Sequence, residues 1–274
     1  MTNMKVFTSV PTTPAYELYE DMLNQTHILV AGQTGSGKSV VINGIITTAL
    51  HKVPAEVGLI LIDPKRVELV EYKNLPHTMY YASEPDDMVR ALEFAMNMCD
   101  SRYKAMQELG MKKYTGSHIY VIIDELADLM TTDKKRVMPL IQRLCQVGRA
   151  AGISVIAATQ CPLATVIPTP IKVNFDTKVA LKTQCAQHSR NIMEANGCEA
   201  LPRYGKAYYI NPDRNGIVNV PMYTDDEREA VTGFWFKAME AKRAEARKAE
   251  APRQTTRKPV EAPRKKGLFA RLFA

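Results

Sequence analysis

The feature that most constrains this chain is a glycine-rich string that follows a short apolar run. Residues 32–39 read GQTGSGKS, which fits the pattern G-x-x-x-x-G-K-[ST]. The preceding HILVA is typical of a buried strand, and the following SVVINGIITTALHK is typical of an amphipathic helix. A strand, a glycine-rich turn and a helix N-terminus together surround a polyanion with backbone N–H groups. The string therefore predicts a phosphate-binding loop.

Each position of this loop has an expected part in binding ATP and Mg²⁺. Glycine permits the unusual φ angles and the close backbone approach that such a loop needs. Lys38 would reach the terminal phosphates, and Ser39 would ligate Mg²⁺. The predicted ATP-binding residues are Gly32, Gln33, Thr34, Gly35, Ser36, Gly37, Lys38, Ser39 and Val40.

A second apolar run, residues 119–123, ends in two carboxylates, Asp124 and Glu125. In a doubly wound sheet the carboxyl ends of the strands line the ligand crevice, so both acids are expected to face the phosphates. Asp124 suits the Mg²⁺ shell through its water ligands, and Glu125 suits positioning the attacking water. Paired acids are equally typical of a helix N-terminus, but the phosphate loop in the same chain favours the catalytic interpretation. Asp128 needs no catalytic role, because an acidic residue on the solvent-exposed face of a helix is common.

Two polar residues flank a third predicted strand at residues 153–159. Gln160 follows this strand and could sense the γ-phosphate or orient water, although a simple strand-end turn predicts the same residue. Arg149 lies near the end of the helix before the strand. It either complements the helix C-terminus or acts as an arginine finger on a neighbouring subunit's nucleotide. The spacing leaves both questions open.

Five blocks of sequence, taken together, resemble the motor domain of the FtsK/SpoIIIE family of DNA translocases. They are VAGQTGSGKSVVIN, LILIDPKRVELVEYKNLPH, YVIIDELADLM, QVGRAAGISVIAATQ and SRNIMEANGCEALPRYG, in order over about residues 27–210. The resemblance implies a RecA-like ATPase that forms a ring, usually a hexamer, around double-stranded DNA and moves along it. It also implies site residues by position: Lys38 and Ser39 in the phosphate loop, Asp124 and Glu125 in the second motif, Gln160 as sensor and Arg149 in trans.

The chain departs from the family pattern in several respects. Family members often carry a membrane-spanning N-terminal region and a C-terminal winged-helix domain, and we expect neither here, since residues 1–26 lack the roughly 20 apolar residues of a span. Cys161 stands where the family usually has arginine, which puts that arginine's coupling contact in doubt. Asp63-Pro64-Lys65 matches a family motif, but a turn forced by proline explains it nearly as well. We therefore expect a bare motor, of a mobile element, phage or conjugative system.

The pattern of the whole chain predicts an α/β fold with a mostly parallel sheet flanked by helices. Strands are expected near residues 27–31, 58–62, 77–82, 118–123, 153–159, 175–181 and 206–210, and long helices at about 38–51, 84–109 and 133–150. The expected organisation is an N-terminal segment at 1–26, a RecA-like ATPase motor domain at 27–224, a helix at 225–250 and a basic, disordered tail at 251–274.

Charge is distributed unevenly between this motor domain and the tail. Residues 237–274 hold twelve Lys or Arg against four Glu, a net charge of +8. The whole chain has +7, which leaves −1 for residues 1–236. If the motor binds DNA, its positive groups must therefore be concentrated on one surface, such as the lumen of a ring.

The tail ends in an apolar stripe, and the cysteines indicate a compartment. Leu268, Phe269, Leu272 and Phe273 share one side of a short terminal helix, which is either a frayed end or a contact with a partner protein or membrane surface. The five cysteines show no C-x-x-C pairing, and no signal peptide is present. We therefore expect ordinary thiols in a reducing, cytoplasmic environment.

These observations together predict a Mg-dependent ATP hydrolase that translocates double-stranded DNA. Two alternatives remain. A related motor could drive the secretion of protein, and a nucleotide-dependent switch could hydrolyse ATP slowly and move nothing. Stimulation of ATP turnover by DNA would separate the first function from the other two.

Overall fold

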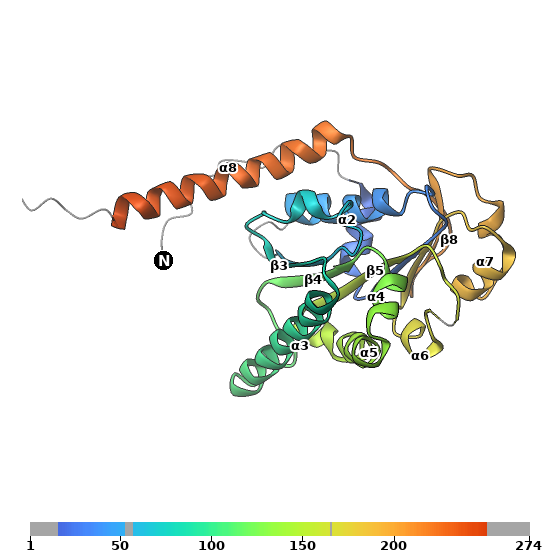
Figure 1. Ribbon diagram of the computed structural model, residues 1–274, viewed down its shortest axis with the longest axis horizontal. Coiled ribbons are helices and arrows are strands. Elements are labelled where there is room, and N and C mark those ends of the chain that lie inside the picture. The colour runs from blue at the N-terminus through green and yellow to red at the C-terminus, as the bar shows by residue number, and fades with distance from the viewer. Residues whose placement is uncertain (1–15, 53–56, 165, 251–274) are drawn as a thin grey trace, which may run out of the picture. The chain divides into compact units, whose positions relative to one another are not determined.

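The computed structural model describes residues 16–52, 57–164 and 166–250, which form an α/β fold around one sheet (Figure 1). The strands are β1 (Ile28–Ala31), β2 (Val57–Ile62), β3 (Thr78–Ala82), β4 (His118–Ile123), β5 (Ile153–Thr159), β6 (Thr177–Ala180), β7 (Lys206–Ile210) and β8 (Asn215–Asn219). The α-helices are α1 (Glu17–Asn24), α2 (Lys38–Lys52), α3 (Pro85–Glu108), α4 (Leu126–Thr132), α5 (Lys134–Ala151), α6 (Thr169–Lys172), α7 (Ala186–Met193) and α8 (Asp225–Glu250). Two 3-10 turns, η2 (Val70–Tyr72) and η3 (Cys198–Ala200), complete the described elements.

The strands follow the order β3-β2-β4-β5-β1-β6-β7-β8 across the sheet. Neighbours from β3 to β6 run parallel, whereas β7 is antiparallel to β6 and β8 is antiparallel to β7. The predicted α/β fold with a mostly parallel sheet is therefore confirmed, with small differences at the strand ends. Strand β8 was missed because its sequence, NGIVN, holds a glycine and two asparagines, which are depleted in strands.

Helices cover both faces of the sheet (Figure 1). Residues of α1 and α2, such as Ile42 and Ile46, form one apolar core with the first face. Residues of α3, α4 and α5, such as Leu92, Leu129 and Leu144, form a second core with the other face. All residues of β2 and β5 are buried, because a strand in the middle of such a sheet has no face in contact with water.

Helix α1 joins the first of these cores through a close approach to α2. Tyr19 is fully buried, and a Cβ added to Gly44 would lie 2.1 Å from the Tyr19 ring. The Tyr19 hydroxyl also donates to the Pro221 carbonyl at 2.5 Å. The expected N-terminal segment thus contributes α1 to the core, and its residues 1–15 lie outside the described part of the chain.

Two residues determine where α5 begins and ends, and so which edge of the sheet its last turn reaches. Asp133 caps the helix by accepting a hydrogen bond from the Arg136 backbone N–H at 3.1 Å. Gly152 ends it in the left-handed conformation, with φ of 65°, and the chain enters β5 at Ile153. Arg149, in the last turn, therefore lies at the edge of the sheet where β5 begins.

Helix α8 packs on the core through its first turns. Val231 is fully buried, and the Trp235 indole N–H donates to the Leu50 carbonyl at 3.2 Å. The Trp235 ring also meets His77 edge to face at 4.7 Å. The expected basic tail at 251–274, with its apolar stripe, lies outside the described residues. Within the described part of the chain, no helix has the length and apolar character needed to cross a membrane.

Candidate active site

The glycine-rich loop lies at the carboxyl ends of three adjacent strands. It connects β1 to α2, and Gly35 and Gly37 have φ of 71° and 102°, which side-chain-bearing residues rarely adopt. The Gly32 N–H donates to the carbonyl of Thr159, the last residue of β5, and the Gln33 N–H donates to the carbonyl of Lys182, which follows β6. The loop is therefore held in place by main-chain hydrogen bonds on both sides.

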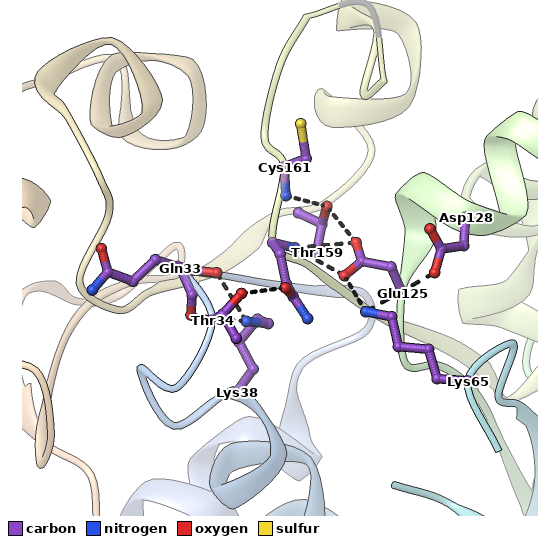
Figure 2. A network of polar contacts seen from close by, with 10 residues as sticks. Gln33, Thr34, Lys38, Lys65, Glu125, Asp128, Thr159 and Cys161 are labelled. Carbon is purple, nitrogen blue, oxygen red and sulfur yellow. Dashed lines mark hydrogen bonds and ion pairs between the residues drawn. The ribbon is translucent and has the colours of Figure 1, made fainter. Parts of the chain in front are cut away.

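Lys38, the first residue of α2, is folded back into this loop. Its ammonium group donates to the Gly32 and Gln33 carbonyls at 2.9 and 3.0 Å, and the residue is buried (Figure 2). Burial lowers the pKa of Lys38, whereas the charge of Glu125 raises it. Ser39 follows as a partly buried residue of the same helix N-terminus. The loop thus presents a cation and a hydroxyl beside a helix end that favours anions.

Glu125 faces the end of β5 rather than the helix that it precedes. It is the N-cap residue of α4, yet its side chain makes no capping hydrogen bond. Instead, its carboxylate accepts hydrogen bonds from the Thr159 hydroxyl at 3.0 Å and from the Gln160 N–H at 3.1 Å (Figure 2). The residue is only 3% exposed. The carboxylate is therefore oriented by β5, as expected of a group that must be aimed at a substrate.

Lys65, from the turn after β2, contacts the same carboxylate. Its ammonium group lies 3.3 Å from Glu125 Oε2 and 3.9 Å from Asp128 Oδ2 (Figure 2). The predicted turn at Asp63-Pro64-Lys65 thus brings a cation to the site. Glu125 Oε2 thus has a cationic partner within the same chain.

Gln160 links the end of β5 to the phosphate loop. Its Oε1 accepts a hydrogen bond from the Thr34 hydroxyl at 2.6 Å. The neighbouring Cys161 donates its backbone N–H to Thr159 Oγ1 at 3.1 Å, and its thiol points away from the network (Figure 2). The side chain at the position of the family's arginine therefore takes no part in these contacts.

Asp124 is buried at the end of β4 among other acids. Burial, with Asp63 and Glu68 nearby, raises the pKa of Asp124 to about 7. Asp63 accepts a hydrogen bond from the Leu69 N–H at 3.0 Å, while its buried Oδ1 has no partner among the described residues. A cation would relieve the repulsion in this acidic cluster. Mg²⁺ prefers oxygen ligands and is usually held by one or two protein groups, so Asp124 and Ser39 fit it chemically.

Arg149 is not part of this arrangement within one subunit. It lies on the exposed surface in the last turn of α5, and its charge acts on His27, which directly precedes β1. Because β1 and β5 are parallel, this is the edge of the sheet where strands begin, opposite the phosphate loop. The structure thus brings together all the predicted site residues except Arg149.

Three residues of the site were not identified as site residues from the sequence. Thr159 was noted only as a strand end, and Lys65 only as part of a family motif that a turn explains nearly as well, although both contact Glu125. Arg203 lies over the phosphate loop, where its Nε is 3.4 Å from the Gly35 carbonyl oxygen. The polar end of a buried strand was a usable signal for Thr159, but no local pattern links Arg203 to a loop 168 residues away.

This fold and this site are those of RecA-like P-loop ATPases. The sequence profile of the FtsK/SpoIIIE family matches residues 13–120 and 116–164. The DNA translocase FtsK of Lactococcus lactis subsp. cremoris is 37% identical over 237 residues, covering 78% of this chain and 31% of that protein. The DNA translocase FtsK of Mesorhizobium japonicum is 35% identical, covering 78% of this chain and 29% of that protein. The chain belongs to the FtsK/SpoIIIE family, and it spans about a third of the length of these relatives.

Solved structures show the same fold. The pCW3 conjugation coupling protein TcpA, in a monomer form with ATPγS, has a TM-score of 0.69 and 25% identity, covering 80% of this chain and 66% of that one. The type VII secretion ATPase EccC of Thermomonospora curvata has a TM-score of 0.65 and 17% identity, covering 76% of this chain and 27% of that one. At 17% identity, the likeness to EccC shows a shared fold and nothing more.

Proposed function

We propose that this chain is the ATPase motor of a DNA translocase, which hydrolyses ATP and moves along double-stranded DNA. One observation carries the proposal. The phosphate loop, Glu125 and Gln160 meet at one edge of the sheet, in a chain that is 37% identical to a DNA translocase FtsK. The likeness to a conjugation coupling protein supports a role in DNA transfer by a mobile element.

The residues of the site divide the work of hydrolysis. Lys38 exchanges its two loop carbonyls for oxygens of the β- and γ-phosphates, and residues 32–40 hold the phosphate chain through backbone N–H groups. Glu125 positions a water molecule and takes its proton, while the water oxygen bonds to the γ-phosphorus. The bond from that phosphorus to the bridging oxygen breaks, and ADP leaves. Gln160, held by Thr34, contacts the γ-phosphate as a sensor.

Mg²⁺, when bound with ATP, neutralises charge that develops on the phosphates. Ser39 and Asp124 are the residues that would hold it, because they offer a hydroxyl and a carboxylate beside the phosphate loop. Asp124 is buried among acids that a cation would stabilise in their ionised form.

Arg149 completes the site of a neighbouring subunit in a homo-oligomeric ring, which we propose to be a hexamer. Its exposed position at the opposite edge of the sheet supports this role, since it cannot act on its own subunit's nucleotide from there. The ring would surround DNA. Residues 1–236 carry a net charge of −1, so positive groups that bind DNA must be concentrated on one surface, which we place at the lumen of the ring. We place this motor in the cytoplasm, with residues 251–274 available to contact a partner protein or a membrane surface.

The test is ATP turnover by the full chain with and without linear duplex DNA, together with displacement of a third strand from a DNA triplex. We expect DNA to stimulate turnover and the triplex strand to be displaced. Stimulation should fall steeply as salt rises, because phosphate contacts release counterions. Turnover that DNA leaves unchanged would favour protein secretion or a switch, and it would overturn the proposal.

A variant distinguishes a DNA-binding lumen from DNA binding by the tail. In this variant the basic residues of 251–274 are replaced by glutamine: Arg253, Arg257, Lys258, Arg264, Lys265, Lys266 and Arg271. We expect it to keep most of the stimulation by DNA. Complete loss would mean that the tail is the DNA contact and that the lumen model is wrong.

A further inference from the structure

Lys182 contacts both the phosphate loop and the start of the loop between η3 and β7. The Lys182 carbonyl accepts the Gln33 N–H at 2.8 Å, on the phosphate-loop side. Its ammonium group donates to the Glu199 and Leu201 carbonyls at 3.0 and 2.8 Å, on the other side. The two loops therefore keep a defined position relative to each other, although their residues lie far apart in the sequence.

Arg203, in the loop between η3 and β7, extends over the tip of the phosphate loop. Its Nε donates to the Gly35 carbonyl at 3.4 Å, and a Cβ added to Gly35 would lie 2.9 Å from Arg203 Nη2. The guanidinium group also lies over the Tyr204 ring, 5.4 Å from its centroid. Arg203 is exposed, and no carboxylate among the described residues forms an ion pair with it.

We propose that Arg203 is a phosphate-binding residue for the nucleotide of its own subunit, an inference that rests on the nucleotide site proposed above. The guanidinium group would exchange the Gly35 carbonyl for a phosphate oxygen. Arginine suits this role because its planar fork matches phosphate oxygens and remains charged. The loop between η3 and β7 holds the guanidinium group over the phosphate loop before the nucleotide binds, so binding costs little conformational entropy. The site thus takes one arginine in cis, from the η3–β7 loop, besides the arginine proposed in trans.

Arg214 offers a matched control. It is another exposed arginine, in the turn between β7 and β8. Strand β7 runs antiparallel to β6, so this turn lies at the opposite edge of the sheet from the phosphate loop. Arg203 precedes β7 and Arg214 follows it, so replacing Arg214 removes the same charge from the other end of this strand without touching the proposed site.

The experiment is isothermal titration calorimetry of the full chain with ATPγS, ADP and AMP in the presence of Mg²⁺. We expect Arg203→Ala to weaken ATPγS binding about tenfold, which corresponds to one charge-assisted hydrogen bond. Arg203→Lys should recover part of the loss, since it keeps the charge without the fork. Arg214→Ala should bind as the unsubstituted chain does. In turnover assays Arg203→Ala should raise KM more than it lowers kcat.

The outcomes separate this inference from the function on which it rests. If the unsubstituted chain binds ATPγS and Arg203→Ala binds it within twofold, Arg203 has no part in phosphate binding. Equal losses for all three nucleotides, together with a lower midpoint of thermal unfolding, would assign Arg203 a structural role and would also overturn the inference. If the unsubstituted chain binds none of the nucleotides, the proposed function itself fails.

Discussion

The two edges of the parallel sheet both hold buried ionisable groups, but these groups have different partners. At the edge where the strands end, Lys38 and Glu125 are buried, and Glu125 pairs with the half-exposed side chain of Lys65. At the edge where the strands begin, Arg102 and His27 are buried, and His118 is half-buried. The first group surrounds the glycine-rich loop, whereas the second surrounds the C-terminus of α5.

Arg102 illustrates the second kind of environment. Its guanidinium group donates to the Ala151 and Gly152 carbonyls at 2.7 and 2.9 Å, where α5 ends, and it lies 4.2 Å from the centroid of the Tyr114 ring. These contacts satisfy the last carbonyls of a helix, which is a structural task. Burial of a charge therefore does not identify an active site. Lys38 and Arg102 both donate to backbone carbonyls, but those of Lys38 belong to a glycine-rich loop before a helix N-terminus, whereas those of Arg102 end a helix.

Replacing Arg149 should have the largest effect on turnover. This residue lies at the edge where the strands begin, yet we propose that it acts in catalysis. An arginine finger contributes about 10³ to 10⁵ in rate, so Arg149→Ala should reduce turnover by that order. Subunits carrying Arg149→Ala keep an intact phosphate loop, and subunits carrying Lys38→Ala keep an intact finger. Mixing the two should restore part of the activity, measured as ATP turnover across a range of ratios.

The control is Arg143→Ala, which removes an exposed arginine from the same helix. It should leave turnover unchanged. If Arg149 only complements the C-terminus of α5, its loss should cost about 0.3–1 kcal/mol of stability and leave turnover intact. That result would show that Arg149 has a structural role and not a catalytic one. The same conclusion would follow if demonstrably mixed oligomers failed to regain activity.

Glu125 and Lys38 test the edge where the strands end. Glu125→Gln keeps the acceptor for Thr159 but cannot take a proton, so turnover should fall about 10²- to 10⁴-fold while ATP binding persists. Lys38→Ala should lose ATP binding as well, since Lys38 contacts the phosphates in the ground state. Binding is measured by calorimetry with ATPγS, and turnover by phosphate release.

Asp128→Asn is the matched control, because Asp128 lies on α4 and is 3.9 Å from the same Lys65 ammonium group. It should change turnover by no more than a few fold. Equal loss of nucleotide binding in Lys38→Ala and Glu125→Gln would contradict the division of roles between them.

The histidines at the other edge give the smallest expected effect, a pH dependence of stability. Burial lowers the pKa of His27 and of His118 to about 4. Between this value and the usual pKa near 6.5, the unfolded chain binds more protons than the folded one. The free energy of unfolding should therefore fall as pH decreases from 6.5 to 4, by at most about 3 kcal/mol for each histidine.

Urea unfolding of the full chain and of His118→Gln at several pH values measures this contribution. The variant should be less stable at pH 7, because His118 Nε2 lies 2.8 Å from the Ser154 hydroxyl oxygen in a hydrogen bond. Its stability should then depend less on pH between 6.5 and 4. Identical slopes in both proteins would show that His118 does not titrate differently on unfolding.

Local sequence was enough to predict those parts of the candidate site that depend on neighbouring residues. The phosphate loop is encoded in eight consecutive residues, because its function needs glycine backbone angles and a helix N-terminus at fixed spacing. Asp124 and Glu125 were predictable for the same reason, since the end of an apolar strand places them at the ligand edge of a parallel sheet. Strand periodicity predicted the fold class in the same way.

Tertiary structure alone decided which distant groups meet those residues. Strand order places β5 between β4 and β1, and this brings Thr159 and Gln160 to Glu125 on one side and Thr34 on the other. The same order sends Arg149 to the opposite edge of the sheet. Arg203 reaches Gly35 from a loop that the Lys182 side chain contacts, while the Lys182 carbonyl accepts the Gln33 N–H of the phosphate loop. Such contacts depend on packing between segments far apart in the chain, and no local spacing records them.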